Sequence, residues 1–352
     1  MKIAQVSPLY ESVPPKLYGG TERVVAYLTD ALLDLGHDVT LFASGDSETQ
    51  AELVPSAPRA LRLAESRDPL SYHMIQLDQV LARADEFDLI HFHTDYIQYP
   101  AARWLKTPHV TTLHGRLDLA DLWPLYDHFR DAPVVSISDA QRKPIPFANW
   151  QGTVYHGLPE ALYRFEPQPG DYLAFLGRMS PEKRPDRAIE IALQAGLPLL
   201  MAAKVDAADR DYFETHIKPL LAHPLIDFIG EIDDRDKQEF LGKARALLFP
   251  IDWPEPFGLV MIEAMACGTP VIAFRNGSVP EVMEDGRSGF VVDDIDQAVT
   301  AVQRLDSLSR RECRAVFEER FSASAMARSY TQVYQRLVAL SGAYPAVVPE
   351  VI

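Results

Sequence analysis

Short apolar blocks alternate along this chain with longer stretches in which apolar residues recur at helical spacing. The apolar blocks are rich in β-branched and aromatic residues and are bounded by polar, Gly or Pro residues, as is typical of buried parallel strands. Expected strands cover residues 2–6, 39–43, 88–92, 109–113, 134–137, 172–176, 198–202, 226–229 and 270–274, with another beginning at 154. Expected helices cover residues 21–35, 188–195, 210–222, 234–244, 259–267 and 322–340, the first with Thr21 as its N-cap.

Regular alternation of strands and helices predicts an α/β fold built on parallel sheets. The chain has 352 residues, which is more than one hydrophobic core usually holds, so two domains are expected. Residues 158–170 contain three prolines and a glycine and are interpreted as a linker. The first domain is therefore expected at residues 1–157 and the second at residues 171–321.

Composition limits the classes of partner and environment that are expected for the chain. It is 47% hydrophobic and 24% charged, as in ordinary globular proteins, and its net charge of −16 leaves no basic stripe for nucleic acid. No apolar run reaches the length of a membrane span or resembles a secretory signal, so we expect a cytoplasmic protein without an integral membrane segment. Its two cysteines, Cys267 and Cys313, indicate neither a disulfide framework nor a metal site.

The stretch from residue 252 to 292 contains the densest candidate chemistry. Glu255 lies between two prolines and therefore belongs to a loop, and the helix expected at 259–267 follows it. The first N–H groups of that helix, near Phe257, Gly258 and Leu259, can bind phosphate or sugar oxygens. Glu263, inside the helix, is interpreted either as an ordinary surface residue or as a carboxylate that faces a polar cleft or a partner.

A second candidate site follows the expected strand at 172–176. Arg178 and Lys183 stand five residues apart on a strand-to-helix loop, and two such cations suit a diphosphate because Arg binds two oxygens and Lys adds a point charge. The alternative is a solvated basic loop. Arg184 and Arg187 are interpreted as surface charges.

In the first half, polar residues follow several expected strands, where open α/β sheets bind ligands. Gly19 and Gly20 form either a simple tight turn or a loop that lets the backbone approach a ligand. His114 precedes a glycine at a strand end and is the strongest histidine candidate. His91 is interpreted as structural, and His93 is left open between the two roles.

Several of these segments together resemble one family. E-P-F-G-L-V-M-I-E, followed by A-M-A-C-G-T-P-V-I-A and G-S-V-P-E, is similar to the donor-site signature of retaining GT-B glycosyltransferases of family 4. G-R-x(4)-K at Gly177, Y-G-G-T-E-R before residue 24 and L-H-G at His114 resemble further motifs of that family, and V-Y-H-G at 154–157 resembles its V-x-N-G element with His156 in place of Asn. The resemblance extends from Gly19 to the last expected helix.

The resemblance implies two Rossmann-like domains that face each other across a cleft, the first completed by the helix at about 322–340. It implies a metal-independent hexosyltransferase without a cofactor, which moves a hexosyl group from a nucleotide-diphosphate sugar to an acceptor hydroxyl with retention of configuration. His114, Arg178, Lys183 and Glu255 would be catalytic. The donor would contact a wider set: Gly19, Gly20, Gly177, Arg178, Lys183, Glu231, Phe257, Gly258, Leu259 and Glu263.

Specificity stays open at this level. The base of the donor is undetermined, so its nucleotide can be UDP, GDP or ADP. The acceptor can be a small molecule, an oligosaccharide or a lipid-linked sugar. Two alternatives share the fold: a sugar-nucleotide epimerase, which would turn over the donor alone, and a non-catalytic nucleotide-sugar binding protein, which would have degraded motifs.

Overall fold

The computed structural model of the chain describes residues 1–16 and 19–343, except for the side chains of residues 234, 235 and 343. It divides into two compact units, one formed by residues 1–157 with the chain from 323 onward, and one formed by residues 158–322. Tyr18 of the Y-G-G-T-E-R motif and the tail from residue 344 lie outside the described residues.

The first unit contains a seven-stranded parallel sheet in the order β3-β2-β1-β4-β5-β6-β7. Strand order reverses between β1 and β4, and open sheets of this type bind ligands beyond the carboxyl ends of the strands at such a point. The strands are β1 (Lys2–Val6), β2 (Asp38–Ser44), β3 (Glu52–Ala57), β4 (Leu89–Phe92), β5 (His109–Thr112), β6 (Pro133–Ser136) and β7 (Asn149–Thr153).

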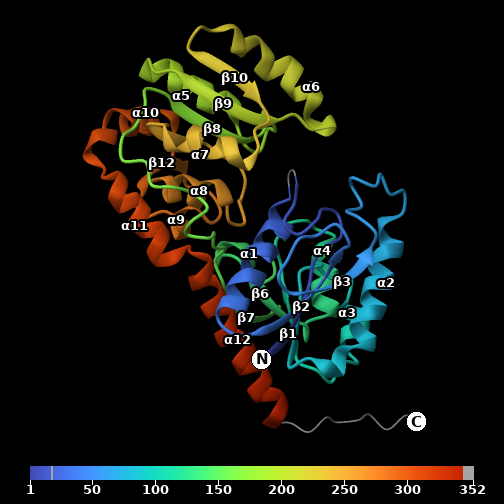
Figure 1. The fold of residues 1–352 in the computed structure, drawn as a ribbon. Coiled ribbons are helices and arrows are strands. Elements are labelled where there is room, and N and C mark those ends of the chain that lie inside the picture. The colour runs from blue at the N-terminus through green and yellow to red at the C-terminus, as the bar shows by residue number, and fades with distance from the viewer. Residues whose placement is uncertain (17–18, 344–352) are drawn as a thin grey trace. The chain divides into compact units, whose positions relative to one another are not determined.

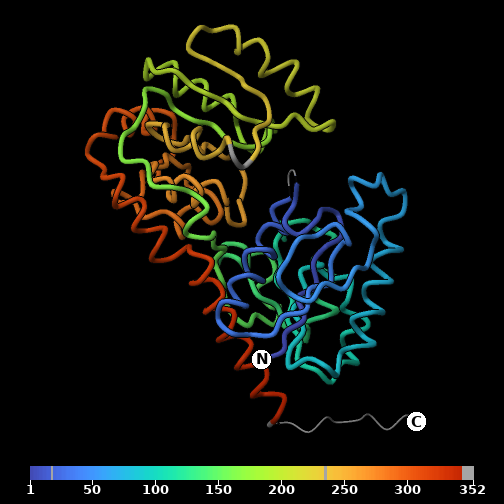
Figure 2. The backbone as a smooth tube through the Cα atoms, in the orientation of Figure 1, coloured from blue at the N-terminus to red at the C-terminus, as the bar shows by residue number. Residues whose placement is uncertain are grey.

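Helices complete the first unit. They are α1 (Gly20–Asp34), α2 (Pro69–Ala82), α3 (Tyr99–Ala102), α4 (Leu122–His128) and α12 (Ala323–Ala343), with 3-10 turns at Ala84–Glu86 and Ala140–Arg142. The last helix, α12, runs beside α1, so segments about 300 residues apart in sequence share one core (Figures 1 and 2). Tyr330 and Tyr334 of α12 are fully buried in that core.

The second unit contains a six-stranded parallel sheet in the order β10-β9-β8-β11-β12-β13, with its reversal between β8 and β11. Its strands are β8 (Leu173–Arg178), β9 (Leu199–Lys204), β10 (Ile226–Gly230), β11 (Ala246–Phe249), β12 (Val271–Phe274) and β13 (Gly289–Val292). Its helices are α5 (Pro185–Ala195), α6 (Arg210–Tyr212), α7 (Asp234–Gly242), α8 (Leu259–Cys267), α9 (Val279–Val282), α10 (Ile295–Gln303) and α11 (Arg310–Arg320) (Figure 1).

Most expected strands are confirmed within one or two residues, and the helix at 259–267 is confirmed as α8. Three expectations were wrong in detail. Helix α1 begins at Gly20 with Gly19 as its N-cap, not Thr21, and the last strand of the first unit ends at Thr153, before residue 154. The helix expected at 210–222 is broken into α6, a π-helical turn at Phe213–Ile217 and a 3-10 turn at Lys218–Ala222, where Pro219 removes a backbone donor.

Candidate functional site

The predicted diphosphate ligands of the second unit, Arg178 and Lys183, lie at the carboxyl end of β8 and in the loop that follows it. Gly177 and Arg178 lie in the last part of strand β8, paired with Ala203 and Lys204 of β9, so placing Arg178 on a loop was wrong. The Arg178 guanidinium lies 3.3 Å from the carboxylate of Glu182 and 3.8 Å from that of Asp209. A cation at the switch point of the sheet is thus held at a partly exposed position by carboxylates.

Lys183 forms an ion pair with Glu255, the loop carboxylate that follows β11. The indole N–H of Trp253 also donates to Glu255, at 3.0 Å, and the ammonium of Lys183 lies 5.3 Å from the centre of the Trp253 ring. The side chains of Lys183 and Glu255 are only 17% and 11% exposed, so little solvent screens the pair. The two predicted catalytic residues therefore meet, although 72 residues separate them.

The segment after β12 braces the loop that holds Glu255. The backbone N–H of Ser278 donates to the carbonyl of Glu255 at 2.9 Å, and the hydroxyl of Ser278 donates to the carbonyl of Phe257 at 2.9 Å. Gly277 has φ +55°, and a Cβ added there would clash with the main chain of Pro254 and Glu255. Only glycine fits such an approach, which gives the G-S-V-P-E motif a structural reason.

Helix α8 begins directly beyond this loop. Gly258, its N-cap, has φ +81°, and a Cβ there would lie 2.8 Å from Cε of Met261 and 3.1 Å from Cζ of Phe249. Phe257 is buried and lies 6.1 Å from the Phe321 ring, whereas Leu259 starts the helix at a half-buried position. The first amides of α8 therefore lie next to Glu255, where a helix N-terminus favours anions.

Glu263 is buried inside α8, with 4% of its surface exposed. Its Oε1 accepts from the ammonium of Lys237 in α7 at 3.1 Å and from the Tyr163 hydroxyl at 3.4 Å. The surface interpretation is therefore wrong, and the expectation of a partner is confirmed. Lys237 was missed, because the sequence holds no signal that links it to a residue 26 positions later.

Arg184 and Arg187 are not simple surface charges. Both are half-buried, and both form ion pairs with Asp252, at 2.8 and 3.0 Å, which ties the loop after β8 to the loop after β11. The interpretation as free surface charges is wrong because this carboxylate, distant in sequence, lies between them. Glu231, predicted near the base, is exposed just beyond the end of β10.

In the first unit, the glycine pair lies at the start of α1. A Cβ on Gly19 would lie 2.8 Å from Cβ of Pro15, 3.0 Å from Cγ of Glu11 and 3.2 Å from Oε2 of Glu22. Gly20 follows as the first helical residue. The φ of Gly19 is extended, so close packing against the buried Glu11 and Glu22, and not left-handed backbone, requires a glycine.

His114 follows β5 and has a partly buried ring. Its Nε2 lies 2.8 Å from Nδ1 of the buried His93, and its own Nδ1 is enclosed without a hydrogen-bond partner among the described residues. Burial lowers the pKa of His114 to about 3, so its ring is neutral at physiological pH. His93, which the sequence left open, is therefore a direct partner of the predicted catalytic histidine.

Behind this pair, the structural interpretation of His91 is confirmed. It is fully buried, with Nδ1 2.7 Å from the Tyr334 hydroxyl and Nε2 2.7 Å from Thr112 Oγ1. Burial, and then the neighbouring histidine His114, hold the pKa of both His91 and His156 well below the usual value. His156 stacks on His114 with ring centres 5.2 Å apart, which is what the His in place of Asn does in this chain.

Gln141, from the segment after β6, fixes the backbone on both sides of His114. Its side-chain amide donates to the carbonyls of Leu113 at 2.9 Å and Gly115 at 2.8 Å. Its oxygen accepts from the N–H of Ile137 at 3.0 Å. The sequence gave no indication of this role, since nothing in the spacing of Gln141 relates it to the strand before it.

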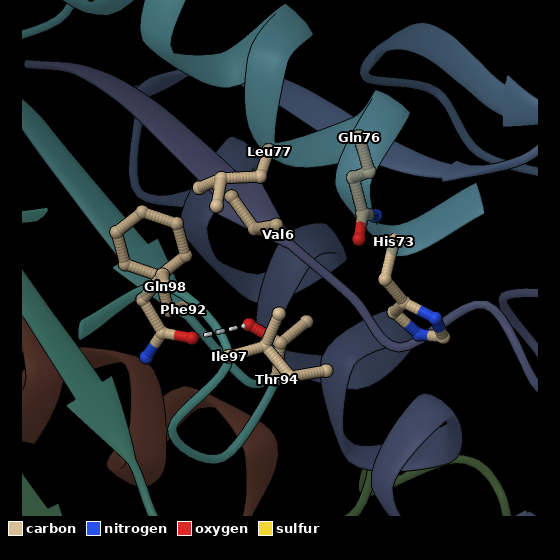
Figure 3. Close-up of a pocket in the computed structure, with 8 residues that line it drawn as sticks. All are labelled: Val6, His73, Gln76, Leu77, Phe92, Thr94, Ile97 and Gln98. Carbon is tan, nitrogen blue, oxygen red and sulfur yellow. Dashed lines mark hydrogen bonds between the residues drawn. The ribbon is translucent and has the colours of Figure 1, made fainter. Parts of the chain in front are cut away.

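Two cavities in the first unit do not coincide with these residues. The smaller, about 10 Å³, has room for roughly one water molecule and lies between β1, α2 and the turn after β4, where Thr94 donates to Gln98 (Figure 3). The larger, about 140 Å³, lies at the amino ends of β5 and β6, which begin at His109 and Pro133. Parallel sheets bind ligands at the opposite, carboxyl edge.

Together the second unit offers cations, a helix N-terminus and buried carboxylates at a sheet switch point, and the first offers a neutral histidine at a strand end. Cations and amides suit phosphate oxygens, and carboxylates and imidazole suit hydroxyl groups. Within the described ranges, no helix combines the length and the apolar character that crossing a bilayer requires.

Comparisons with known proteins identify the family of the chain. Residues 164–325 match the family described as Glycosyl transferases group 1, and residues 18–145 match Glycosyltransferase Family 4. The chain is 25% identical to the phosphatidyl-myo-inositol mannosyltransferase of Mycobacterium leprae, over 97% of this chain and 98% of that protein.

Solved structures share the fold. AviGT4, a glycosyltransferase involved in avilamycin A biosynthesis, is 25% identical with a TM-score of 0.74, covering 96% of this chain and 98% of that one. HepE of Anabaena, solved with UDP and glucose, is 18% identical with a TM-score of 0.73, covering 96% and 100%. The two family matches cover most of both units, and the chain belongs to the GT-B glycosyltransferases of group 1 and family 4.

Proposed function

We propose that this chain is a retaining hexosyltransferase that moves a sugar from a nucleotide-diphosphate donor to an acceptor hydroxyl. The observation that carries the proposal is the ion pair of Lys183 with Glu255 beside the start of α8, with Arg178 at the carboxyl end of β8, next to the β8–β11 switch point. In such an enzyme the slow event is departure of the diphosphate, and preorganised cations and amides stabilise the charge that develops on it.

The roles of single residues follow from their chemistry. Arg178 and Lys183 bind the diphosphate, so that no divalent metal is required. Glu255 releases Lys183 to the phosphates and accepts hydrogen bonds from sugar hydroxyls, and Glu263 accepts from the ribose. His114, which is neutral, contacts the transferred sugar.

The relatives support a sugar transfer but differ in substrate. One is named a phosphatidyl-myo-inositol mannosyltransferase, others are named glycogen synthase, and HepE was solved with UDP-glucose. We therefore propose a nucleotide sugar as the donor and leave its base to experiment. We further propose a cytoplasmic enzyme whose acceptor is a small molecule, an oligosaccharide or a lipid-linked sugar.

A thermal-shift panel of UDP-, GDP- and ADP-sugars tests the donor. We expect the melting temperature to rise with one nucleotide and the rise to disappear in Lys183→Ala, because ligand that binds only the folded chain stabilises it. Loss of Lys183 also leaves Glu255 buried without its cation, which destabilises the chain by itself. The double variant Lys183→Ala/Glu255→Ala removes that complication.

Lys218→Ala is the matched control, since Lys218 forms an exposed ion pair with Glu214 on the same unit. A shift for the same nucleotide in the wild type and in both Lys183 variants would contradict the diphosphate assignment. Turnover of the bound donor without any acceptor would favour the epimerase alternative, and binding without turnover of any kind would favour a binding protein.

A further inference from the structure

A continuous row of polar side chains leads from α12 to His114 through the buried core of the first unit. The amide of Gln5 on β1 donates to the Tyr334 hydroxyl at 3.3 Å, and its oxygen lies 2.7 Å from Nε2 of His93. Nδ1 of His93 lies 2.8 Å from Nε2 of His114. Gln5, His93 and Tyr334 are almost completely buried, so water does not compete for these bonds.

The orientation of Gln5 fixes the direction of every bond in the row. An amide oxygen can only accept, so His93 carries its proton on Nε2, and its Nδ1 must accept. His114 therefore donates from Nε2 to His93, and its own Nδ1 has a lone pair. At the other end, the Tyr334 hydroxyl accepts from Gln5 and retains its own proton, which it can donate to Nδ1 of His91 2.7 Å away. This end is compatible with the direction that Gln5 sets.

The row ends at the lone pair of His114 Nδ1. This atom is buried and accepts no hydrogen bond within the part of the chain that the structure describes. Gln141 holds the backbone on both sides of His114, so the ring is also fixed in place. A nitrogen lone pair accepts from hydroxyl groups and repels phosphate oxygens, which offer lone pairs only.

We infer that Gln5 and His93 are positioning residues that fix the tautomer of His114, so that its Nδ1 accepts a hydrogen bond from a sugar hydroxyl. The ligand in this inference rests on the proposed function, whereas the tautomer does not. The opposite orientation of Gln5 would reverse the whole row and place a proton on Nδ1, which would then suit a phosphate oxygen.

The tautomer is read by ¹⁵N NMR on the full chain labelled in its histidine rings, without any ligand. His114→Asn identifies the His114 signals among the ten histidines by their disappearance. We expect a proton on Nε2 and none on Nδ1 in the wild type. A proton on Nδ1 would overturn the inference, and because this measurement needs only the wild type and an assignment variant, it decides even if core variants fold poorly.

Gln5→Met tests the positioning role, because methionine keeps the size of glutamine and removes its amide. We expect a mixture of His114 tautomers in this variant and no change in the control Gln194→Met, an exposed glutamine on α5. An unchanged single tautomer in Gln5→Met would show that Gln5 does not set it.

Binding then identifies the hydroxyl. We compare the Kd of the nucleotide sugar selected by the donor panel with the Kd of the corresponding nucleoside diphosphate. In Gln5→Met we expect the Kd of the nucleotide sugar to rise by roughly two- to tenfold, the loss typical of one hydrogen bond. We expect the Kd of the nucleoside diphosphate to stay unchanged.

Other outcomes distinguish a hydroxyl of the donor from one of the acceptor, and a failure of this inference from a failure of the proposed function. If both Kd values hold while kcat/KM falls for the acceptor, the hydroxyl belongs to the acceptor. If Kd of the nucleoside diphosphate weakens equally, or if nothing weakens, the inference is overturned. A chain that binds no nucleotide sugar would refute the proposed function and this ligand, although the NMR result on the tautomer would stand.

Discussion

Lys183 and Glu255 form an ion pair, and under the proposed function a diphosphate would compete with Glu255 for the ammonium. This arrangement holds a partly buried lysine beside a carboxylate. Under that proposal, binding of phosphate is linked to release of the carboxylate, which then becomes available to hydroxyl groups of the sugar.

Glu255→Gln should separate these two effects. The amide no longer competes as an anion, so we expect the nucleoside diphosphate to bind about three- to tenfold more tightly, while kcat for sugar transfer falls because a charged acceptor for the sugar hydroxyls is lost. Calorimetric titration and steady-state kinetics measure the two changes. Weaker binding of the nucleoside diphosphate in Glu255→Gln would show that Glu255 does not compete for Lys183.

At this scale the sequence predicted types of residue better than their partners. The spacing of Arg178 and Lys183 and the two prolines beside Glu255 were sufficient to propose a site. The contact of Lys237 with Glu263 depends on how α7 packs against α8, and that of Asp252 with Arg184 on how two loops meet, and no local pattern encodes either.

At the scale of elements, the loops after strands hold the site through their glycines. Gly277 and Gly286 both have positive φ, at +55° and +78°, but only Gly277 lies against other main chain, and Gly286 has open space. Substitutions at these two glycines therefore distinguish the free-energy cost of the backbone conformation from the cost of close packing.

We expect Gly286→Ala to lower the free energy of unfolding by about 1 kcal/mol, the cost of left-handed backbone alone. Gly277→Ala should cost about 2–4 kcal/mol, because the Glu255 loop must move, and it should also weaken nucleotide-sugar binding. Denaturant unfolding and titration of the donor measure both. Equal losses in the two variants would mean that Gly277 does not brace the loop.

The pattern of apolar residues predicted buried strands well because both faces of a parallel strand are covered and its sequence is continuously apolar. It gave no strand at β3, β11 or β13 and no helix at α2, α3, α4, α9, α10 or α11. Leu70, Met74 and Ile75 of α2 are large apolar residues that stay exposed, so α2 lacks a clear apolar face. The π-helical turn at Phe213–Ile217 likewise follows from packing and has no local signature.

At the scale of the whole molecule, buried histidines are distributed unequally between the units. His73, His91, His93 and His156 are buried in the first unit, whereas His216 and His223 of the second are exposed. Burial lowers the pKa of His73 and holds the pKa of the other three rings well below the usual value, so those three are neutral when folded. The alternation of strands and helices in the sequence predicted the two sheets, but not this difference between them.

Acid should therefore unfold the first unit before the second. The folded pKa lies below the unfolded value, so between the two only the unfolded chain takes up the proton, and stability present above about pH 6.5 is lost as pH falls. Each neutral histidine costs about 1.4 kcal/mol per pH unit in this range. We expect calorimetry at pH 7 and pH 5 to show a marked fall in the melting temperature of one transition. That transition is assigned to the first unit by the loss of this fall in His93→Gln. Equal falls in the melting temperatures of both transitions would contradict the expectation.

The chain leaves the first unit at Gly157 and returns to it only at Ala323, whereas the second unit is continuous. On the ribosome, the second unit is therefore complete before α12 has been made, and α12 supplies Tyr330 and Tyr334 to the core of the first. Until then the seven strands made first have an unfilled core, with Gln5 and His91 lacking their tyrosine partners. The part of the chain that is synthesised first is thus the part that finishes folding last.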